Sequence, residues 1–160
     1  MPELGDYMVT ATGGWFARKI REITHSGVNH AGVYVGLEYL VEAQPGGAKL
    51  TRIREYPEAV WSRVLLTSRQ RHDIASAALD LVGTPYNFMD IAAQAVVRVF
   101  GWHAPKWALR RLSTSKRLQC AQLVDLAYER AGVRLFPDGR PEGLVAPSDL
   151  YDLIKRGSDG

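Results

Sequence analysis

Residues 28–44 have the sequence VNHAGVYVGLEYLVEAQ, in which two apolar runs stand on either side of Gly36. Side chains that alternate with a period of two are typical of β-strands with one buried face. In the first run, His30, Gly32 and Tyr34 would share one face of the strand. The opposite face is apolar and is expected to belong to the core: Ala31, Val33 and Val35.

Short runs rich in β-branched and aromatic residues continue this pattern along the chain. The expected strands cover residues 6–10, 28–35, 39–43, 49–53 and 60–66. Glycine and proline residues separate them, as is usual where strands end in turns. Because the connections are short, we expect an antiparallel meander.

Helical periodicity predicts helices over 16–23, 69–82, 90–100 and 120–131, a last helical turn at 147–150 and a frayed tail from about 157. Ser68 is the expected cap of the second helix. The helix over 120–131 has an apolar stripe and ends before a glycine. The predicted fold class is α+β, with the antiparallel sheet packed against the helix that begins at the cysteine.

The composition fits a single globular domain, expected over residues 1–160. Cys120 is the only cysteine, which excludes an internal disulfide framework and a cysteine-rich zinc site. No pair of histidines or cysteines has the close spacing of a metal site, so we expect neither metal nor cofactor. The N-terminus has no basic segment followed by an apolar core, and we expect a cytoplasmic product without a secretory signal.

Cys120 stands where the helix over 120–131 is expected to begin. A helix N-terminus favours the thiolate, which is the nucleophilic form of cysteine. His30 opens a strand-like run far upstream, and a cysteine with a histidine base is a recurrent pair in carbonyl chemistry. We therefore expect Cys120 as nucleophile and His30 as base, with His25 as the second candidate for the base. The alternative is an unreactive buried cysteine.

Glu42 is the candidate for orienting His30. If a three-residue turn centred on Gly36 joins the two strands, position 30 lies opposite position 42 and the side chains can interact. A two-residue turn would pair other positions and bring Gln44 diagonally near. Glu42 is thus the expected third residue and Gln44 its substitute, and the alternative for Glu42 is an exposed strand carboxylate.

A basic segment precedes the cysteine, with no acidic residue between Asp90 and Asp125. Such a surface can attract an anionic substrate, a lipid or a nucleic acid, although a solvated basic loop is an equal alternative. The apolar stretch over 91–107 is interrupted by polar and charged residues, which favours an interfacial or buried helix over a membrane span. The expected substrate-binding cations are Arg110, Arg111, Lys116 and Arg117.

Several short motifs occur in a definite order over most of the chain. They are Gly5-Asp6, HAGVY at 30–34, VEA at 41–43, GTPYNF at 83–88, CAQLV at 120–124 and APSDL at 146–150. In this order the chain resembles the circularly permuted NlpC-like branch of the papain-fold superfamily, in which the histidine strand precedes the cysteine helix.

The resemblance implies a papain-like permuted fold and a cysteine hydrolase, with Cys120 as nucleophile, His30 as general base and Glu42 as the polar third residue. Tyr86 is an auxiliary candidate, because the preceding turn at 83–85 would present its ring near the site and its hydroxyl could donate to an oxyanion. The backbone N–H of Cys120 is the more general oxyanion donor.

The leading hypothesis is therefore a cysteine peptidase or amidase that cleaves an amide through an acyl-enzyme, in a peptide or a peptidoglycan stem. To reach the cell wall, the protein would require cell lysis, association with a virion or signal-independent export. The related families also act on lipids, so the second hypothesis is an acyl-lipid acyltransferase or deacylase with peripheral contact to an anionic membrane. The third is a binding or structural module without catalysis. No feature indicates specific nucleic-acid recognition.

Overall fold

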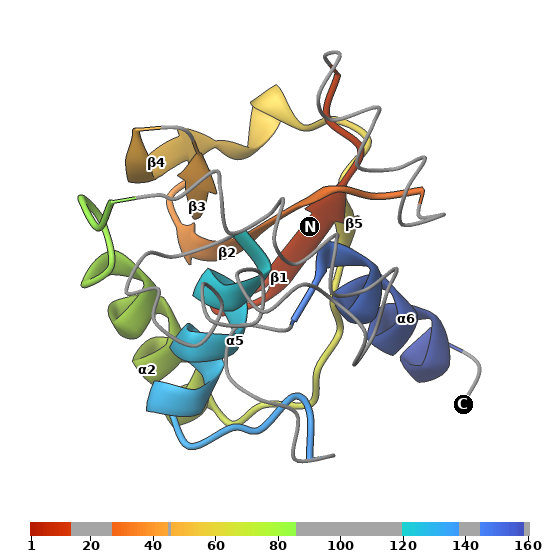
Figure 1. Ribbon diagram of the computed structural model, residues 1–160. Coiled ribbons are helices and arrows are strands. Elements are labelled where there is room, and N and C mark those ends of the chain that lie inside the picture. The colour runs from red at the N-terminus through yellow and green to blue at the C-terminus, as the bar shows by residue number, and fades with distance from the viewer. Residues whose placement is uncertain (14–26, 45, 86–119, 138–144, 159–160) are drawn as a thin grey trace, which may run out of the picture.

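The computed structural model describes residues 1–13, 27–44, 46–85, 120–137 and 145–158 (Figure 1). These residues form an α+β fold with a five-stranded antiparallel sheet of order β4-β3-β2-β1-β5. The strands are β1 (Tyr7–Thr10), β2 (His30–Gly36), β3 (Tyr39–Gln44), β4 (Gly47–Arg52) and β5 (Val60–Trp61). The helices are α2 (Ser68–Leu79), α5 (Cys120–Arg130) and α6 (Pro147–Ser158), and a short 3-10 helix, η1 (Ile53–Glu55), follows β4.

The predicted meander is correct for β2, β3 and β4 but wrong for the last strand. β5 does not lie next to β4; it pairs with β1 at the opposite edge of the sheet. It is also only two residues long, whereas the sequence predicted a strand over 60–66. Beyond Trp61, the Ser62 hydroxyl accepts a hydrogen bond from the backbone N–H of Tyr7 at 2.9 Å. A side chain therefore takes a backbone donor that a longer β5 would use.

A two-residue turn joins β2 to β3, which is the second of the two turn lengths considered from the sequence. Gly36 pairs with Tyr39, and the turn residues Leu37 and Glu38 have φ angles of 51° and 63°. Two successive residues with positive φ are typical of tight hairpins, because this turn matches the twist of the strands. The pairing register also shifts next to the turn. The cross-strand partners in β2 and β3 therefore differ from those expected for a three-residue turn.

The start of α2 also differs from the prediction, because Thr67 and not Ser68 is its cap. The Thr67 hydroxyl accepts a hydrogen bond from the backbone N–H of Gln70, and the Gln70 side chain accepts one from the backbone N–H of Thr67. This reciprocal arrangement is a capping box. The helix ends at Leu79, earlier than predicted, and turns lead from there to Gly83, whose φ is 86°.

α5 begins at Cys120 as predicted, and Gly132 follows its end with a φ of 74°. α6 is longer than the predicted single turn, since it has 12 residues and includes Gly157. The helices predicted over 16–23 and 90–100 lie outside the described residues. None of the helices that the structure describes is long and apolar enough to cross a lipid bilayer.

The core lies between the sheet and the helices. α2 and α5 lie side by side against β2, and α6 is on the other side of α5 (Figure 1). The predicted core face of β2 is confirmed, because Ala31 and Val33 are fully buried and Val35 packs against the same cluster. From the helices, this cluster includes Ile74, Ala78, Leu123, Val124, Ala127 and Leu150.

Two buried tyrosines connect the layers of this core. The Tyr128 hydroxyl on α5 donates to the backbone oxygen of Gly5 at 2.7 Å, and the Tyr7 hydroxyl on β1 donates to that of Leu150 at 3.1 Å. The two rings meet edge to face, with centroids 5.8 Å apart. These contacts hold α5 in a definite position relative to the sheet, and so determine where its first residue lies.

Candidate functional site

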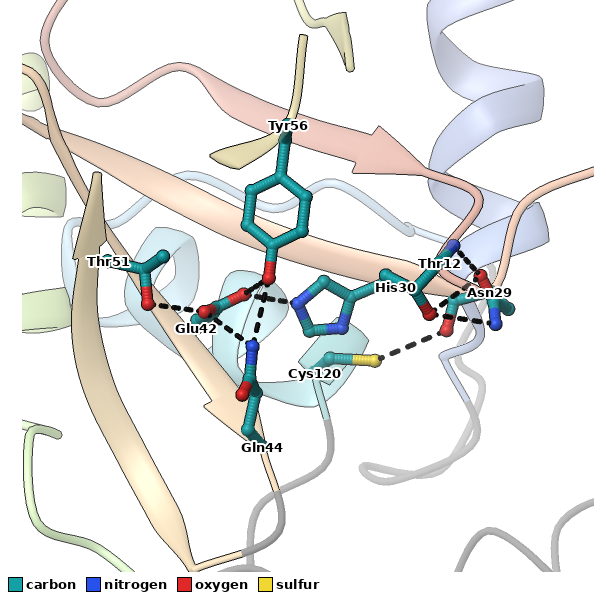
Figure 2. Close-up of polar contacts among 8 residues, drawn as sticks. All are labelled: Thr12, Asn29, His30, Glu42, Gln44, Thr51, Tyr56 and Cys120. Atoms are coloured by element: carbon teal, nitrogen blue, oxygen red, sulfur yellow. Dashed lines mark hydrogen bonds and ion pairs between the residues drawn. The ribbon is translucent and has the colours of Figure 1, made fainter. Parts of the chain in front are cut away.

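Cys120 is the first residue of α5 and lies near the N-terminal end of β2. Its Sγ is 4.0 Å from the backbone oxygen of Asn29, the residue that precedes β2 (Figure 2). The cysteine is a free thiol and 7% exposed. The first N–H groups of a helix have no partner within the helix. Cys120 therefore combines a nucleophilic atom with a backbone position suited to binding an oxyanion.

Asn29 is held in place by Thr12, which follows β1. The backbone N–H of Thr12 donates to Oδ1 of Asn29 at 2.7 Å, and Nδ2 of Asn29 donates to the Thr12 hydroxyl at 3.1 Å. The backbone N–H of Asn29 also donates to the oxygen of Thr10 at 3.0 Å. These contacts tie the end of β1 to the start of β2 and fix the carbonyl that lies near the sulfur.

The side chain of His30 lies between Cys120 and Glu42 (Figure 2). Its Nε2 forms a hydrogen bond and ion pair with Oε2 of Glu42. Its other ring nitrogen, Nδ1, is on the side of the ring that faces Cys120, and the interaction with the Cys120 side chain is among the causes that raise the pKa of His30. The imidazole therefore connects the thiol to the carboxylate.

The predicted contact between His30 and Glu42 is confirmed, and it forms in the register of the two-residue turn. Gly32 lies opposite Glu42, so His30 reaches it diagonally from further along β2. A Cβ on residue 32 would lie 2.9 Å from Cδ1 of Leu40 and 3.4 Å from Cβ of Glu42. Because Gly32 has no side chain, the space between the two strands stays open for the imidazole.

Glu42 is fully buried and accepts hydrogen bonds from several side chains. Its Oε2 accepts from Nε2 of His30 and from the Tyr56 hydroxyl, the latter at 2.6 Å. Its Oε1 accepts from the Thr51 hydroxyl and from Nε2 of Gln44, the latter at 2.7 Å. A buried carboxylate is costly unless it is paired and hydrogen-bonded. Glu42 is both, so the exposed strand carboxylate considered from the sequence is excluded.

Thr51 and Tyr56 were not among the site residues predicted from the sequence. Thr51 could have been found from strand alternation, because Lys49 pairs with Glu42 and Thr51 lies two residues further on the same face. Tyr56 carried no such signal, since it follows η1 in a turn. Its ring centroid is 5.6 Å from that of His30, and its hydroxyl also accepts from Nε2 of Gln44 at 2.9 Å.

The charge states of His30 and Glu42 follow from this packing. Burial lowers the pKa of His30, but its hydrogen bonds and charge interactions with Cys120 and Glu42 outweigh burial and raise the pKa to about 9. Burial raises the pKa of Glu42, but the contacts with His30, Thr51 and Tyr56 lower it below its usual value. Burial and the neighbouring Glu42 raise the pKa of Tyr56. At neutral pH an imidazolium therefore lies beside a carboxylate, with the tyrosine as a neutral donor.

The structure brings together Cys120, His30 and Glu42, and it places Gln44 beside Glu42 through the hydrogen bond described above. The other predicted positions lie outside the described residues: Tyr86, Arg110, Arg111, Lys116, Arg117 and His25. Within the described ranges, no group of three or more His, Cys, Asp and Glu side chains could hold a metal ion. The chemistry of the described site is that of a thiol, an imidazole and a carboxylate.

Comparisons with known proteins bear on the fold. No family model matches the chain, and no curated protein matches it. Among solved structures, the chain is similar to the crystal structure of the metalloprotein yiiX from Escherichia coli O157:H7, described as DUF1105. The TM-score is 0.60 at 23% identity, and the match covers 84% of this chain and 69% of that chain. At this identity the likeness concerns the fold alone.

Fold and site together define an α+β protein with a buried cysteine–histidine–glutamate arrangement. Such an arrangement provides a nucleophile, a group that accepts and returns a proton, and an anion that orients that group.

Proposed function

We propose that this protein is a cysteine hydrolase that cleaves an amide bond through an acyl-enzyme on Cys120. The observation that carries the proposal is the position of the His30 ring between Cys120 and Glu42, with Nε2 paired to the carboxylate and Nδ1 on the side that faces the thiol (Figure 2). The papain-like, permuted arrangement is part of the same proposal. It is supported by the chain order, in which the histidine strand precedes the helix that begins with cysteine.

The proposed reaction has two halves. The Cys120 thiolate attacks the substrate carbonyl, and the backbone N–H of Cys120 stabilises the oxyanion that forms. Nδ1 of His30 then gives its proton to the leaving amine, the carbon–nitrogen bond breaks, and a thioester remains on Cys120. His30 next takes a proton from water, which attacks the thioester and releases the carboxylic acid and the Cys120 thiolate, so the initial thiolate and imidazolium are restored. Glu42 keeps the ring oriented throughout.

For the substrate we propose a peptide or a peptidoglycan stem, on the basis of the NlpC-like resemblance. The alternative function, a lipid acyltransferase or deacylase, uses the same nucleophile and differs only in the acyl donor. A panel containing peptides, purified cell wall and anionic acyl-lipid vesicles separates the two readings. Turnover of lipid alone would move the proposal to a lipid acyltransferase or deacylase.

The test is turnover on this panel together with mass spectrometry of the protein during the reaction. We expect an acyl adduct on Cys120 and a loss of roughly a thousandfold or more in turnover for Cys120→Ala, because a covalent nucleophile has no substitute. Leu65→Ala is a matched control, since Leu65 is 99% exposed. Full activity of Cys120→Ala would overturn the proposal. So would a Cys120 thiol in the native protein that reacts with iodoacetamide no faster than the unfolded chain.

A further inference from the structure

Tyr56 is a partly buried polar group of the site that the reaction above does not use. It comes from the turn after η1, whereas the three residues of the proposed mechanism come from β2, β3 and α5. Its ring lies 5.6 Å from the His30 ring, tilted by 44°, and its hydroxyl is 2.6 Å from Oε2 of Glu42. Tyr56 therefore contacts both partners of the ion pair.

Oε2 of Glu42 is shared between two donors. It accepts from Nε2 of His30 and from the Tyr56 hydroxyl, while Oε1 is occupied by Thr51 and Gln44. A neutral hydroxyl that donates to a carboxylate oxygen reduces the negative charge which that oxygen presents to a second donor. The hydroxyl therefore weakens the ion pair between Glu42 and the imidazolium without removing the contact.

This matters because the imidazolium must release a proton during the reaction. A carboxylate that holds the cation too strongly makes it a poorer acid toward the leaving amine. The Tyr56 ring lies beside the imidazole. Because the Glu42 carboxylate accepts the hydrogen bond from Nε2 of His30, Nε2 is the ring nitrogen that keeps its hydrogen. Nδ1 is then the nitrogen left to exchange protons with Cys120 and the substrate.

We propose that Tyr56 is a positioning residue of this site: its hydroxyl shares Oε2 of Glu42 with His30, and so keeps the imidazolium oriented while leaving its Nδ1 proton transferable. The inference rests on the proposed hydrolase function for its purpose, but the arrangement can be tested without turnover. Among the described residues, the titratable groups that face His30 are Cys120 from α5, Glu42 from β3 and Tyr56 itself.

The test is an NMR titration of His30 in the full chain, comparing wild type with Tyr56→Phe and with Tyr39→Phe as the matched control. Tyr39 contacts Arg52 at the other end of β3 and is a partner of neither His30 nor Glu42 in the contacts described here. Loss of the Tyr56 hydroxyl should raise the midpoint of the His30 titration by about half to one pH unit, because Oε2 of Glu42 then interacts with the imidazolium alone. Tyr39→Phe should leave it unchanged. A midpoint in Tyr56→Phe that is unchanged or lower would overturn the proposal.

Alkylation of Cys120 supplies a second readout. In Tyr56→Phe the rate of this reaction with iodoacetamide at pH 7 should stay within about twofold of wild type, since alkylation needs the thiolate and no leaving-group proton. On an amide substrate, kcat should fall with little change in KM. A parallel loss of alkylation at pH 7 would indicate a merely structural role and would contradict the proposal.

The wild-type protein alone provides a further check that needs no variant. Above the His30 midpoint, nitrogen chemical shifts should show the neutral ring with its hydrogen on Nε2; a ring with its hydrogen on Nδ1 would overturn the assignment. If the native thiol has no enhanced reactivity, the hydrolase proposal fails. The His30 midpoint and tautomer still decide the role of Tyr56 in that case.

Discussion

In the proposed mechanism the reactivity of the site depends on His30, because its ring lies between the thiol and the carboxylate. At neutral pH it carries the positive charge that stabilises a thiolate nearby. Changes at position 30 should therefore affect thiol chemistry more than changes at any other histidine.

We predict that His30→Ala suppresses alkylation of Cys120 near pH 7 and lowers turnover by about a hundredfold or more, since a positioned base contributes on this scale. The rate of iodoacetamide labelling as a function of pH measures the first effect. His72→Ala is the control, because His72 lies exposed on α2. Equal labelling of His30→Ala and wild type would show that the imidazole does not activate the thiol.

Glu42→Gln replaces a carboxylate that accepts from four groups by an amide with a single acceptor oxygen. The unpaired donors should lower the free energy of unfolding by about 1–3 kcal/mol. Turnover should fall, but less than in Cys120→Ala, and its upper pH limit should move down because the anion that raises the pKa of His30 is gone. Urea unfolding and pH–rate profiles measure these effects.

Gln44→Ala is the companion variant to Glu42→Gln. In the structure Gln44 donates to Glu42 and Tyr56, so its loss should produce the milder defect. A large defect in Gln44→Ala, with full activity in Glu42→Gln, would transfer the role of third residue to Gln44.

At the scale of elements, β2 and β3 must approach closely for the site to form. Gly32 faces Glu42 across this pair, and a Cβ there would lie 3.0 Å from the backbone oxygen of Val41 as well as within 2.9 Å of the Leu40 side chain. The backbone oxygen cannot move without disturbing the hairpin. The spacing of the two strands therefore determines whether the imidazole reaches its carboxylate.

We predict that Gly32→Ala lowers the free energy of unfolding by roughly 1–3 kcal/mol, the usual range for overpacking, and reduces alkylation of Cys120 because the strands are pushed apart at the site. Gly13→Ala is the control, because nothing lies within 4 Å of a Cβ at that position. Chemical denaturation and labelling rates test the pair. Wild-type stability and reactivity in Gly32→Ala would contradict the close packing argued here.

For the whole molecule, the ion pair in the site makes stability depend on pH. The pKa of His30 is raised from 6.5 to about 9 on folding, so its contribution is complete below pH 6.5 and is lost as the pH rises through 9. The pKa of Glu42 is lowered from 4.5, so its contribution is complete above pH 4.5 and is lost as the pH falls further. Both contributions are complete between these two values.

We predict a plateau in the free energy of unfolding between about pH 4.5 and 6.5 and a decline toward pH 9 that is weaker in His30→Ala than in wild type. Urea unfolding of both proteins across this range measures the difference. Because Glu42 also loses the imidazolium that lowers its pKa, the difference between the two curves reports the His30–Glu42 pair. Parallel curves for wild type and His30→Ala would contradict the raised pKa.

Local signals in the sequence were sufficient for several parts of the molecule. The alternation in residues 28–44 identified the core face of β2, and the apolar stripe after Cys120 identified α5 and its first residue. Both features are visible in single segments, because strand and helix periodicities are set by the local backbone. His30 and Glu42 could also be paired in advance, since a hairpin brings neighbouring segments together.

Only the tertiary structure determined the register and the surroundings of Glu42. The two-residue turn places Gly32 opposite Glu42, and β5 crosses to the far edge of the sheet instead of extending the meander. Tyr56 reaches the site from a turn whose own sequence carries no periodic signal. Turn geometry, edge pairing and contacts between distant segments depend on how the whole chain packs, and a one-residue change of register moves every side chain to the other face of a strand.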